Sequence, residues 1–158
     1  MPLVLCRVDD RLIHGQVVIG WGRPLAARRV LLVDDEVAAN SWEQELYRMA
    51  VPDGVEIVFA GAQEAMRHLA EWQADPVRSI LLTGSIETLA TLYGADPAAM
   101  HRINLGGVHH RPGRTERLPY IYLTADEYRA LTGLEARGAD VTAQDVPSAS
   151  PVGLRELA

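Results

Sequence analysis

The stretch Leu3-Val-Leu-Cys-Arg-Val8, which leads into Asp9-Asp-Arg11, decides the fold class. It is rich in β-forming residues and has no polar side chain before Arg7, which is typical of a buried strand in a parallel sheet. The segment 15–27 follows with apolar residues at the spacing of a core-facing helix, and Pro24 predicts a kink or break near its end. A buried strand, a charged loop and a helix in this order predict the first unit of an α/β domain.

The same alternation of strand and helix repeats along the chain. Further strands are predicted at 29–33, 55–59, 79–83, 102–105, 119–123 and 139–146. Helices are predicted at 41–50, 62–72, 86–93 and 125–137, and the tail 147–158 is expected to lie over the surface. We therefore predict one domain over residues 1–158, an α/β fold with a doubly wound, mostly parallel sheet and helices on both faces.

Composition excludes several classes of protein. The chain has 158 residues, of which 48% are apolar and 23% are charged, the balance of a globular domain. All 15 basic residues are arginine, so pyridoxal chemistry and P-loop NTPase activity, which need a lysine, are excluded. The net charge of −6 argues against a nucleic-acid partner.

Features that bear on location favour the cytoplasm. Cys6 is the single cysteine and cannot form an internal disulfide, which suits a reducing compartment. No apolar run approaches the roughly 20 residues of a membrane span. Residues 1–5 do not resemble the start of a signal peptide. We therefore expect a cytoplasmic protein without direct membrane insertion.

Polar residues cluster where the first predicted strand ends, in Asp9-Asp-Arg-Leu-Ile-His-Gly-Gln16. Ligand sites of open parallel sheets lie outside the carboxyl ends of the strands, so we expect the functional site here. Imidazole is a competent nucleophile for phosphoryl transfer, which makes His14 the candidate catalytic residue. Arg11 could add a bidentate contact to a phosphoryl group. The plainer alternative is a loop histidine that caps a helix.

The neighbours of His14 suit the same chemistry. Gly15 lets the backbone approach a ligand closely, and Gly15 and Gln16 begin a helix whose unpaired N–H groups could bind phosphate. Asp9 or Asp10 is expected to orient the imidazole through its second nitrogen and to organise the arginine.

The segment Arg7-Val-Asp-Asp-Arg-Leu-Ile-His-Gly-Gln-Val-Val18 resembles the active-site signature of a known family. This is the IIB component family of the mannose/fructose/sorbose class of the bacterial phosphoenolpyruvate-dependent sugar phosphotransferase system. The resemblance covers nearly the whole chain and continues through Val33–Ala38, Met49–Val55, Ile103–Gly107, Glu135–Gly138 and Val146–Val152.

The resemblance implies a phosphocarrier, a protein-N(pi)-phosphohistidine–sugar phosphotransferase. His14 falls on the family's phosphorylated histidine, which reacts at Nδ1, and Asp9, Asp10 and Arg11 fall on the loop around it. A IIA component would donate the phosphoryl group, and membrane IIC and IID components would hold the sugar that receives it. No cofactor or metal is implied, and the expected state is a monomer or weak homodimer.

Two segments at the predicted site depart from the family pattern. After Gly106-Gly107 the family shows Met or Ile, one residue and then Phe, where this chain has Val108-His-His110. After the strand 79–83 it tends to read Phe, one residue and Asn, where this chain has Thr83-Gly-Ser85. These departures leave phosphorylation of His14 as the expectation and bear on partner choice and sugar class.

Other residues near the predicted site have weaker claims. Trp21, Gly107 and His109 are expected at its rim. His109 and His110 invite a metal site, but adjacent strand residues point to opposite faces, so a loop histidine pair is the plainer reading. The basic stretch His109–Arg117 could dock an acidic IIA surface or simply form a solvated hairpin.

Two other functions remain open from the sequence. A regulatory phosphohistidine protein without a transport role would use the same residues as a phosphocarrier. A nucleotide-binding doubly wound domain would be indifferent to the loss of His14.

Overall fold

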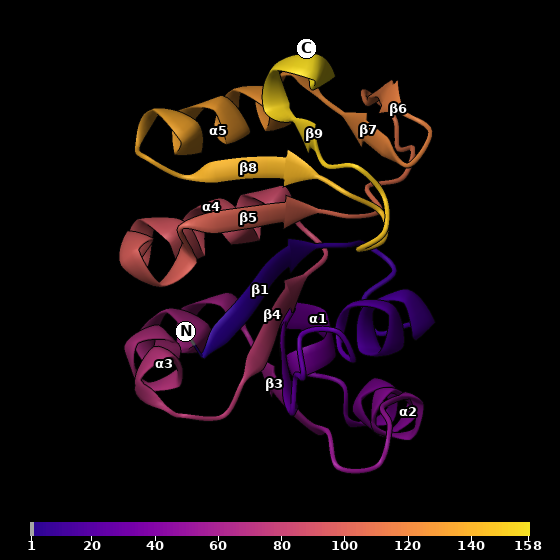
Figure 1. The fold of residues 1–158 in the computed structure, drawn as a ribbon, viewed down its shortest axis with the longest axis vertical. Helices are drawn as coiled ribbons and strands as arrows, with labels where there is room; N and C mark the ends of the chain where they lie inside the picture. The colour runs from indigo at the N-terminus through magenta and orange to yellow at the C-terminus, as the bar shows by residue number, and fades with distance from the viewer. Residues whose placement is uncertain (1) are drawn as a thin grey trace.

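The structure is a computed structural model and describes residues 2–158. Within them a seven-stranded sheet has the order β3-β2-β4-β1-β5-β8-β9. Its strands are β1 (Leu3–Val8), β2 (Arg29–Val33), β3 (Glu56–Ala60), β4 (Ser79–Thr83), β5 (Arg102–Leu105), β8 (Asp140–Ala143) and β9 (Val152–Gly153). Figure 1 shows the chain starting on β1, in the middle of this sheet. The predicted fold class is confirmed, because the described pairs of this sheet from β3 to β8 are parallel and only the pair of β9 with β8 is antiparallel.

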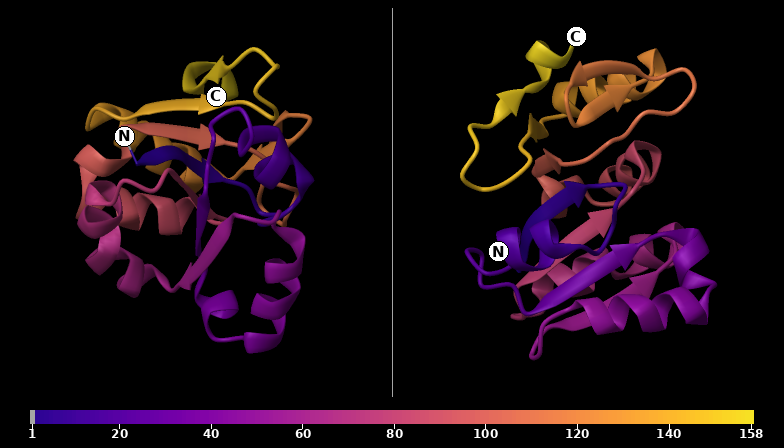
Figure 2. Two further views of the ribbon diagram at one scale, coloured as in Figure 1. Left: turned by 60° about the horizontal axis from the view of Figure 1, so that its bottom comes forward. Right: turned by 90° about the vertical axis from the view of Figure 1, so that its right-hand side faces the viewer.

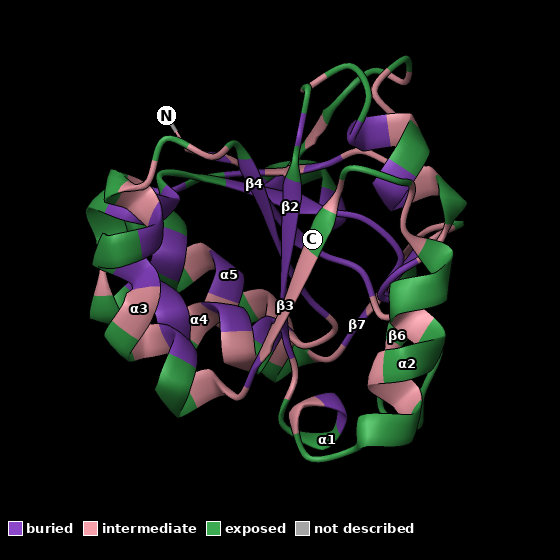
Figure 3. Cartoon of the chain, turned by 90° about the horizontal axis from the view of Figure 1, so that it is seen from below, coloured by how far each residue is buried: buried purple, intermediate pink, exposed green. Residues whose placement is uncertain are grey.

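Helices cover both faces of the sheet. They are α1 (Asp35–Ala38), α2 (Ser41–Ala50), α3 (Ala62–Ala74), α4 (Ile86–Ala95), α5 (Ala125–Ala136), the π-helix η1 (Gln16–Trp21) and the 3₁₀ helices η2 (Pro97–Met100) and η3 (Leu154–Leu157). Figure 3 shows α3, α4 and α5 grouped on one side of the buried strands, with α2 on the other side. None of the helices within 2–158 is long and apolar enough to cross a membrane.

Successive side chains of each strand point to opposite faces of the sheet and pack into two hydrophobic cores, one on each face. In β2, Leu31 and Val33 pack with α3, α4 and α5, whereas Val30 and Leu32 pack on the opposite face with η1. All residues of β2 and β4 are buried. Burial on both faces explains why these strands are continuous apolar runs in the sequence.

The predicted helix at 15–27 is wrong in length and type. Only Gln16–Trp21 is helical, and it is a π-helix in which the N–H of Gly22 donates to the carbonyl of Val17, five residues back. The segment beyond it turns, and Ala26 has a positive φ of 53°. Pro24 has no N–H to continue a helix, which accounts for the early end. The apolar residues Val17, Val18 and Trp21 of this segment are buried, as the core-facing spacing indicates.

The C-terminal third also differs from the expectation in detail. The strand predicted at 119–123 is β7 (Ile121–Leu123), which pairs with β6 (Thr115–Leu118) in a small antiparallel hairpin. The strand predicted at 139–146 ends at Ala143. The tail does not merely lie over the surface, because β9 pairs with β8 and Leu154 and Leu157 are buried in the core. Figure 2 shows this tail folded back beside β8. A capping box of Thr124 and Glu127 marks the start of α5.

Candidate functional site

The carboxylate of Asp9, at the end of the central strand β1, organises the site. It is fully buried, and its Oδ2 accepts hydrogen bonds from Arg7 Nη2 at 3.2 Å and Arg11 Nη2 at 2.9 Å. The same oxygen lies 3.2 Å from Nε2 of His14. Oδ1 accepts from the backbone N–H and the Nε of Arg11. Asp9 therefore joins the two predicted site residues Arg11 and His14.

The backbone of the loop sets this arrangement. The N–H of Asp9 donates to Thr83 at the end of β4, and the N–H of Leu12 donates back to the carbonyl of Asp9. Leu12 has a positive φ of 59°, so the chain reverses there. Leu12 and Ile13 are both buried and anchor the loop. Their burial leaves His14, one-fifth exposed, and Arg11, one-third exposed, turned toward the open edge.

Arg7 belongs to the site although it was not among the predicted residues. Its side chain is fully buried, and Nη1 donates to Asn104 on β5 and to the carbonyl of Gln144, while Nη2 donates to the carbonyl of Asp145 as well as to Asp9. A charged residue inside an otherwise apolar strand was the signal in the sequence, since a buried charge must be paired. Apart from Asp9, its partners lie about 100 to 140 residues away along the chain, so spacing alone could not reveal them.

Gly106 leaves room for the Arg7 side chain, and Trp21 packs against it. A Cβ on Gly106 would collide with the guanidinium, so glycine is required at that position. The guanidinium lies 5.2 Å from the ring centroid of Trp21, whose Nε1 donates to the carbonyl of Asp145. Trp21 is therefore buried behind the site and supports Arg7; it does not line an open rim as predicted.

The charges of this cluster are coupled. Burial alone would raise the pKa of Asp9, but hydrogen bonds with His14 and Arg11 and the charge of Arg7 hold that pKa well below its usual range. Burial lowers the pKa of Arg7, and Asp9 opposes this effect. The hydrogen bond with Asp9 raises the pKa of Arg11. Asp9 is therefore ionised at neutral pH and stabilises positive charge on its partners.

Contact with Asp9 leaves the other ring nitrogen of His14 uncommitted. A carboxylate acceptor at Nε2 favours the tautomer with the proton there, which leaves the Nδ1 lone pair available. Space beside the next residue is open, because a Cβ built on Gly15 would meet nothing within 4 Å. The carbonyl of His14 already accepts from the N–H groups of Val17 and Val18.

The predicted role of Gln16 rests on its backbone N–H and does not involve its side chain. Its side chain has a buried Oε1 without a hydrogen-bond partner in the part of the chain that is described. No contact in that part joins its amide to His14.

Among the described residues the carboxylate of Asp10 is bonded to His109, and no hydrogen bond or ion pair joins it to His14. One carboxylate oxygen of Asp10 lies 2.5 Å from His109 Nδ1, and the other accepts the His109 backbone N–H at 2.7 Å. The N–H of Asp10 donates to Gly107. Gly107 and His109 therefore lie next to Asp10, beside the loop that carries His14.

The basic stretch 109–117 is largely engaged within the molecule. Arg114 forms a two-point ion pair with Glu127 of α5, and Arg117 lies over Tyr128 and donates to the carbonyl of Leu157. Arg114 and Arg117 are therefore structural, which favours the hairpin interpretation over an open docking patch for these two arginines.

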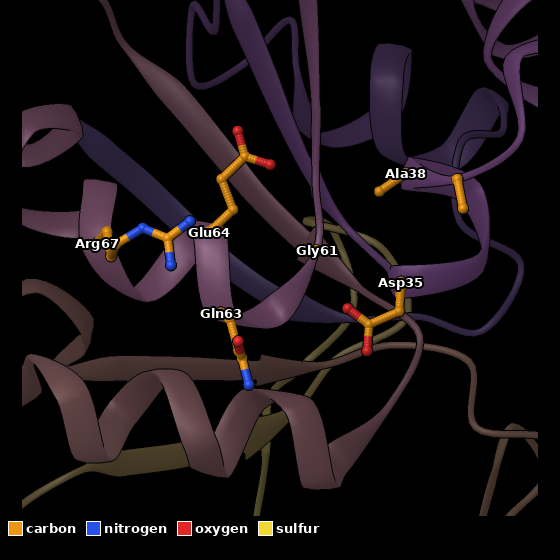
Figure 4. Close-up of a pocket in the computed structure, with 7 residues that line it drawn as sticks. Asp35, Ala38, Gly61, Gln63, Glu64 and Arg67 are labelled. Carbon is orange, nitrogen blue, oxygen red and sulfur yellow. The ribbon is translucent and has the colours of Figure 1, made fainter.

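Other features of the described residues lie away from this site. A pocket of about 440 Å³ lies between α1 and the start of α3 (Figure 4). The carboxylate of Asp35, which lines it, accepts the N–H of Ala62. The pocket does not include His14. No group of three or more His, Cys, Asp or Glu residues within 2–158 is arranged to hold a metal ion.

The fold and the site together define an open α/β domain with a carboxylate-held histidine where its central strand ends. The chain belongs to the family described as the PTS system sorbose subfamily IIB component, whose model matches residues 3–158. It is therefore a phosphotransferase component that acts in sugar phosphotransfer.

Individual relatives agree with this assignment. The N-acetylgalactosamine-specific phosphotransferase enzyme IIB component 2 of Escherichia coli K12 is 31% identical over 99% of both chains. The crystal structure of the IIBSor domain of the sorbose permease from Klebsiella pneumoniae superposes with a TM-score of 0.91 at 25% identity, covering 99% of this chain and 96% of that one. The mannose-specific EIIAB component of E. coli K12 is 27% identical over 99% of this chain but only 48% of its own length.

Proposed function

We propose that His14 is the phosphoryl-carrying residue of this protein and that Nδ1 is the atom that reacts. The contact between its Nε2 and the buried carboxylate of Asp9, at 3.2 Å, is the observation that carries this proposal. A carboxylate on one ring nitrogen both fixes the tautomer and stabilises the positive charge that the ring acquires when the other nitrogen forms a bond.

The reaction is an in-line phosphoryl transfer between two imidazoles. The Nδ1 lone pair of His14 attacks the phosphorus of a donor phosphohistidine, and the donor's N–P bond breaks with its electron pair returning to the donor ring. The proton on Nε2 stays in place, held by Asp9. In the second step a sugar hydroxyl attacks the phosphorus and passes its proton to water, while the N–P bond breaks with its electron pair returning to Nδ1, so that His14 leaves as neutral imidazole.

Arg11 supplies positive charge to the transferring group. Its Nε and Nη2 are held by Asp9, whereas Nη1 has no hydrogen-bond partner among the described residues. A guanidinium fixed on one side and open on the other is suited to contact phosphoryl oxygens as charge builds up in the transition state. The N–H groups of Gly15 and Gln16 precede the first intrahelical bonds, so they would be further donors to the phosphoryl group.

The donor we propose is a IIA component, and the acceptor is a sugar held by membrane IIC and IID components. The match to about half of a mannose-specific EIIAB protein supports a IIA partner, because that name joins the two components in one chain. We place the transfer in the cytoplasm, in keeping with the free, buried thiol of Cys6. No observation favours the regulatory alternative.

Phosphorylation with a verified phospho-IIA donor tests the assignment. We expect intact mass spectrometry to show an acid-labile phosphoryl group on the protein and ³¹P NMR to show a Nδ1-linked phosphohistidine. His14→Ala abolishes the Nδ1 signal, and His110→Ala, which changes an exposed histidine packed edge-on to Tyr122, keeps it. A Nδ1 signal that survives in His14→Ala contradicts the assignment. No phosphorylation of the wild type by an active donor contradicts the carrier function itself.

A further inference from the structure

A second histidine–carboxylate pair stands beside the first. His109 lies in the loop after β5, with Nδ1 2.5 Å from Oδ1 of Asp10 and its backbone N–H bonded to the other oxygen of the same carboxylate. Half of the His109 side chain is exposed, and Asp10 is largely buried, with 13% of its side chain accessible. Asp10 therefore grips both the backbone and the ring of this residue.

The two pairs have opposite ring polarity. Asp9 holds Nε2 of His14, which leaves Nδ1 open, whereas Asp10 holds Nδ1 of His109, which leaves Nε2 open. Nε2 of His109 has no hydrogen-bond partner within the described chain. With the proton fixed on Nδ1 by a carboxylate, Nε2 carries the lone pair, so both rings present one nucleophilic nitrogen.

Both rings also share the positive group of the site. The position that a Cβ on Gly107 would occupy lies 2.8 Å from Cε1 of His109, 3.0 Å from Nε of Arg11 and 3.1 Å from Oδ1 of Asp9. The His109 ring, through Cε1, and the Arg11 side chain, through Nε, therefore lie against the same point beside Gly107. Arg11 is thus close to both histidines.

The loop that carries His109 is held in place. The N–H of Asp10 donates to the carbonyl of Gly107, which joins the loops after β1 and β5. Arg114, fixed by its ion pair with Glu127, donates through Nη1 to the carbonyl of His109 at 2.8 Å. The ring is therefore preorganised, although it lies at an exposed edge.

We propose that His109 is a second phosphoryl acceptor, which takes the group on Nε2 from a protein phosphohistidine donor. The Nε2 lone pair forms the new N–P bond, the donor's N–P bond breaks, and its electron pair returns to the donor imidazole. The Nδ1 proton remains, and Asp10 balances the positive charge of the ring. This inference takes its donor class from the function proposed above.

His68 also forms a histidine–carboxylate pair, but it lies outside the arginine-containing site. His68 Nδ1 lies 2.9 Å from Glu71 on α3, and its side chain is 41% exposed. No arginine accompanies this pair in the described hydrogen bonds and ion pairs. His68 is therefore a matched control for whether a carboxylate-held imidazole alone accepts the group.

Variants that lack His14 test the proposal directly. The single variant His14→Ala and the double variants His14→Ala/His109→Gln and His14→Ala/His68→Gln are incubated with phospho-IIA, and far-UV circular dichroism checks their folding. We expect the single variant and the His68 double variant to gain one acid-labile phosphoryl group with the ³¹P signal of a Nε2 linkage. The His109 double variant gains none. Peptide mapping places the group on the peptide that contains His109.

The possible results separate the two proposals. If His14→Ala stays unmodified while the wild type is phosphorylated at His14, His109 is not an acceptor and the carrier function stands. If both double variants are still modified, His109 is again excluded. If a folding defect affects His14→Ala, His14→Gln replaces it, and the wild type is mapped for a second phosphoryl group at His109. A wild type that gains none from an active donor overturns both proposals.

Discussion

Asp9 determines the reactive geometry at the scale of single residues, because its two oxygens bind three different side chains. Arg7 holds it from inside the sheet, and Arg11 and His14 hold it from the open edge. The position of the imidazole therefore depends on a buried guanidinium that does not itself reach the reacting nitrogen. Arg7 is a positioning residue.

Replacement of Arg7 by methionine is expected to impair phosphoryl transfer as well as folding stability. Removing one partner of a buried ion pair costs about 3–5 kcal/mol. A carboxylate displaced by about 1 Å can cost about 10²-fold in rate. We expect Arg7→Met to slow phosphorylation of His14 by this order in rapid-quench assays, and ¹H–¹⁵N NMR to show loss of the Nε2–H tautomer preference.

Arg29→Met provides the matched control. Arg29 is also buried, and it is hydrogen-bonded to Ser79 and Asp75. It lies at the start of β2, so it is at the amino-terminal ends of the strands, away from the site. It should lose stability without a change in the His14 tautomer. Equal effects of the two variants on the tautomer and the rate would mean that Arg7 acts only through stability.

Residue chemistry was partly readable from the sequence. The spacing of Asp9, Arg11 and His14 within one loop predicts that they meet, and they do. The sequence could not predict which of the two aspartates faces the imidazole of His14. Asp10 binds His109 instead, and His109 lies in a loop about 100 residues further along the chain. Long-range partners of this kind leave no local pattern.

At the scale of secondary structure, η1 begins two residues after His14 and lies on the face of the sheet opposite to α3, α4 and α5. Its π-type bond from Gly22 to Val17 widens the helix at its C-terminal end. A Cβ on Gly22 would collide with the carbonyl of Val18, whereas a Cβ on Gly20 would meet nothing within 4 Å. Glycine is therefore required at only one of these two positions.

Alanine substitutions at the two glycines should have opposite effects. Gly22→Ala forces backbone to move and should cost about 1–3 kcal/mol in the free energy of unfolding, as overpacking does. Gly20→Ala fits the space and should be neutral or stabilising by about 0.4–1 kcal/mol. Urea unfolding measures both, and we expect phosphorylation of His14 to fall in Gly22→Ala only. A tolerated Gly22→Ala would show that η1 does not depend on this close approach.

Local sequence patterns predicted most helices and strands, but they did not predict the π-helix η1. The helices α3, α4 and α5 follow the 3.6-residue spacing of apolar residues, and the capping box marks the start of α5. The spacing in 15–27 indicated a longer α-helix, because a π-helix buries residues at nearly the same positions. Tail residues such as Leu154 were missed, since short segments that pair at a sheet edge have too few residues for a period.

For the whole molecule, the site follows from strand order. β1 lies between β4 and β5, its chain continues to η1 on one face, and the chain after β4 continues to α4 on the other. Neighbouring strands whose connections leave on opposite faces create a crevice at their carboxyl ends, which is where His14 and His109 lie. The sequence predicts that the site lies at the carboxyl ends of the strands. The order of the strands is known only from the structure.

Because β1 is the central strand, the ionisation of its thiol is tied to global unfolding. Cys6 is buried, and burial raises the pKa of its thiol to about 12, whereas an unfolded cysteine titrates near about 8.5. Between these values the unfolded chain loses a proton that the folded chain keeps, so the contribution of Cys6 to stability is complete below about pH 8.5 and falls as pH rises above it.

Urea unfolding of the wild type and Cys6→Ala between pH 7 and 10, under reducing conditions, measures this effect. The cavity left by the substitution costs the same at every pH, whereas the thiol contribution does not. We expect the stability of the wild type relative to Cys6→Ala to be constant at the lower end and to decline above about pH 8.5, by at most about 1.4 kcal/mol per pH unit. A difference that stays constant up to pH 10 would mean that the thiol ionises equally well in the folded state, and hence that β1 is open to solvent without global unfolding.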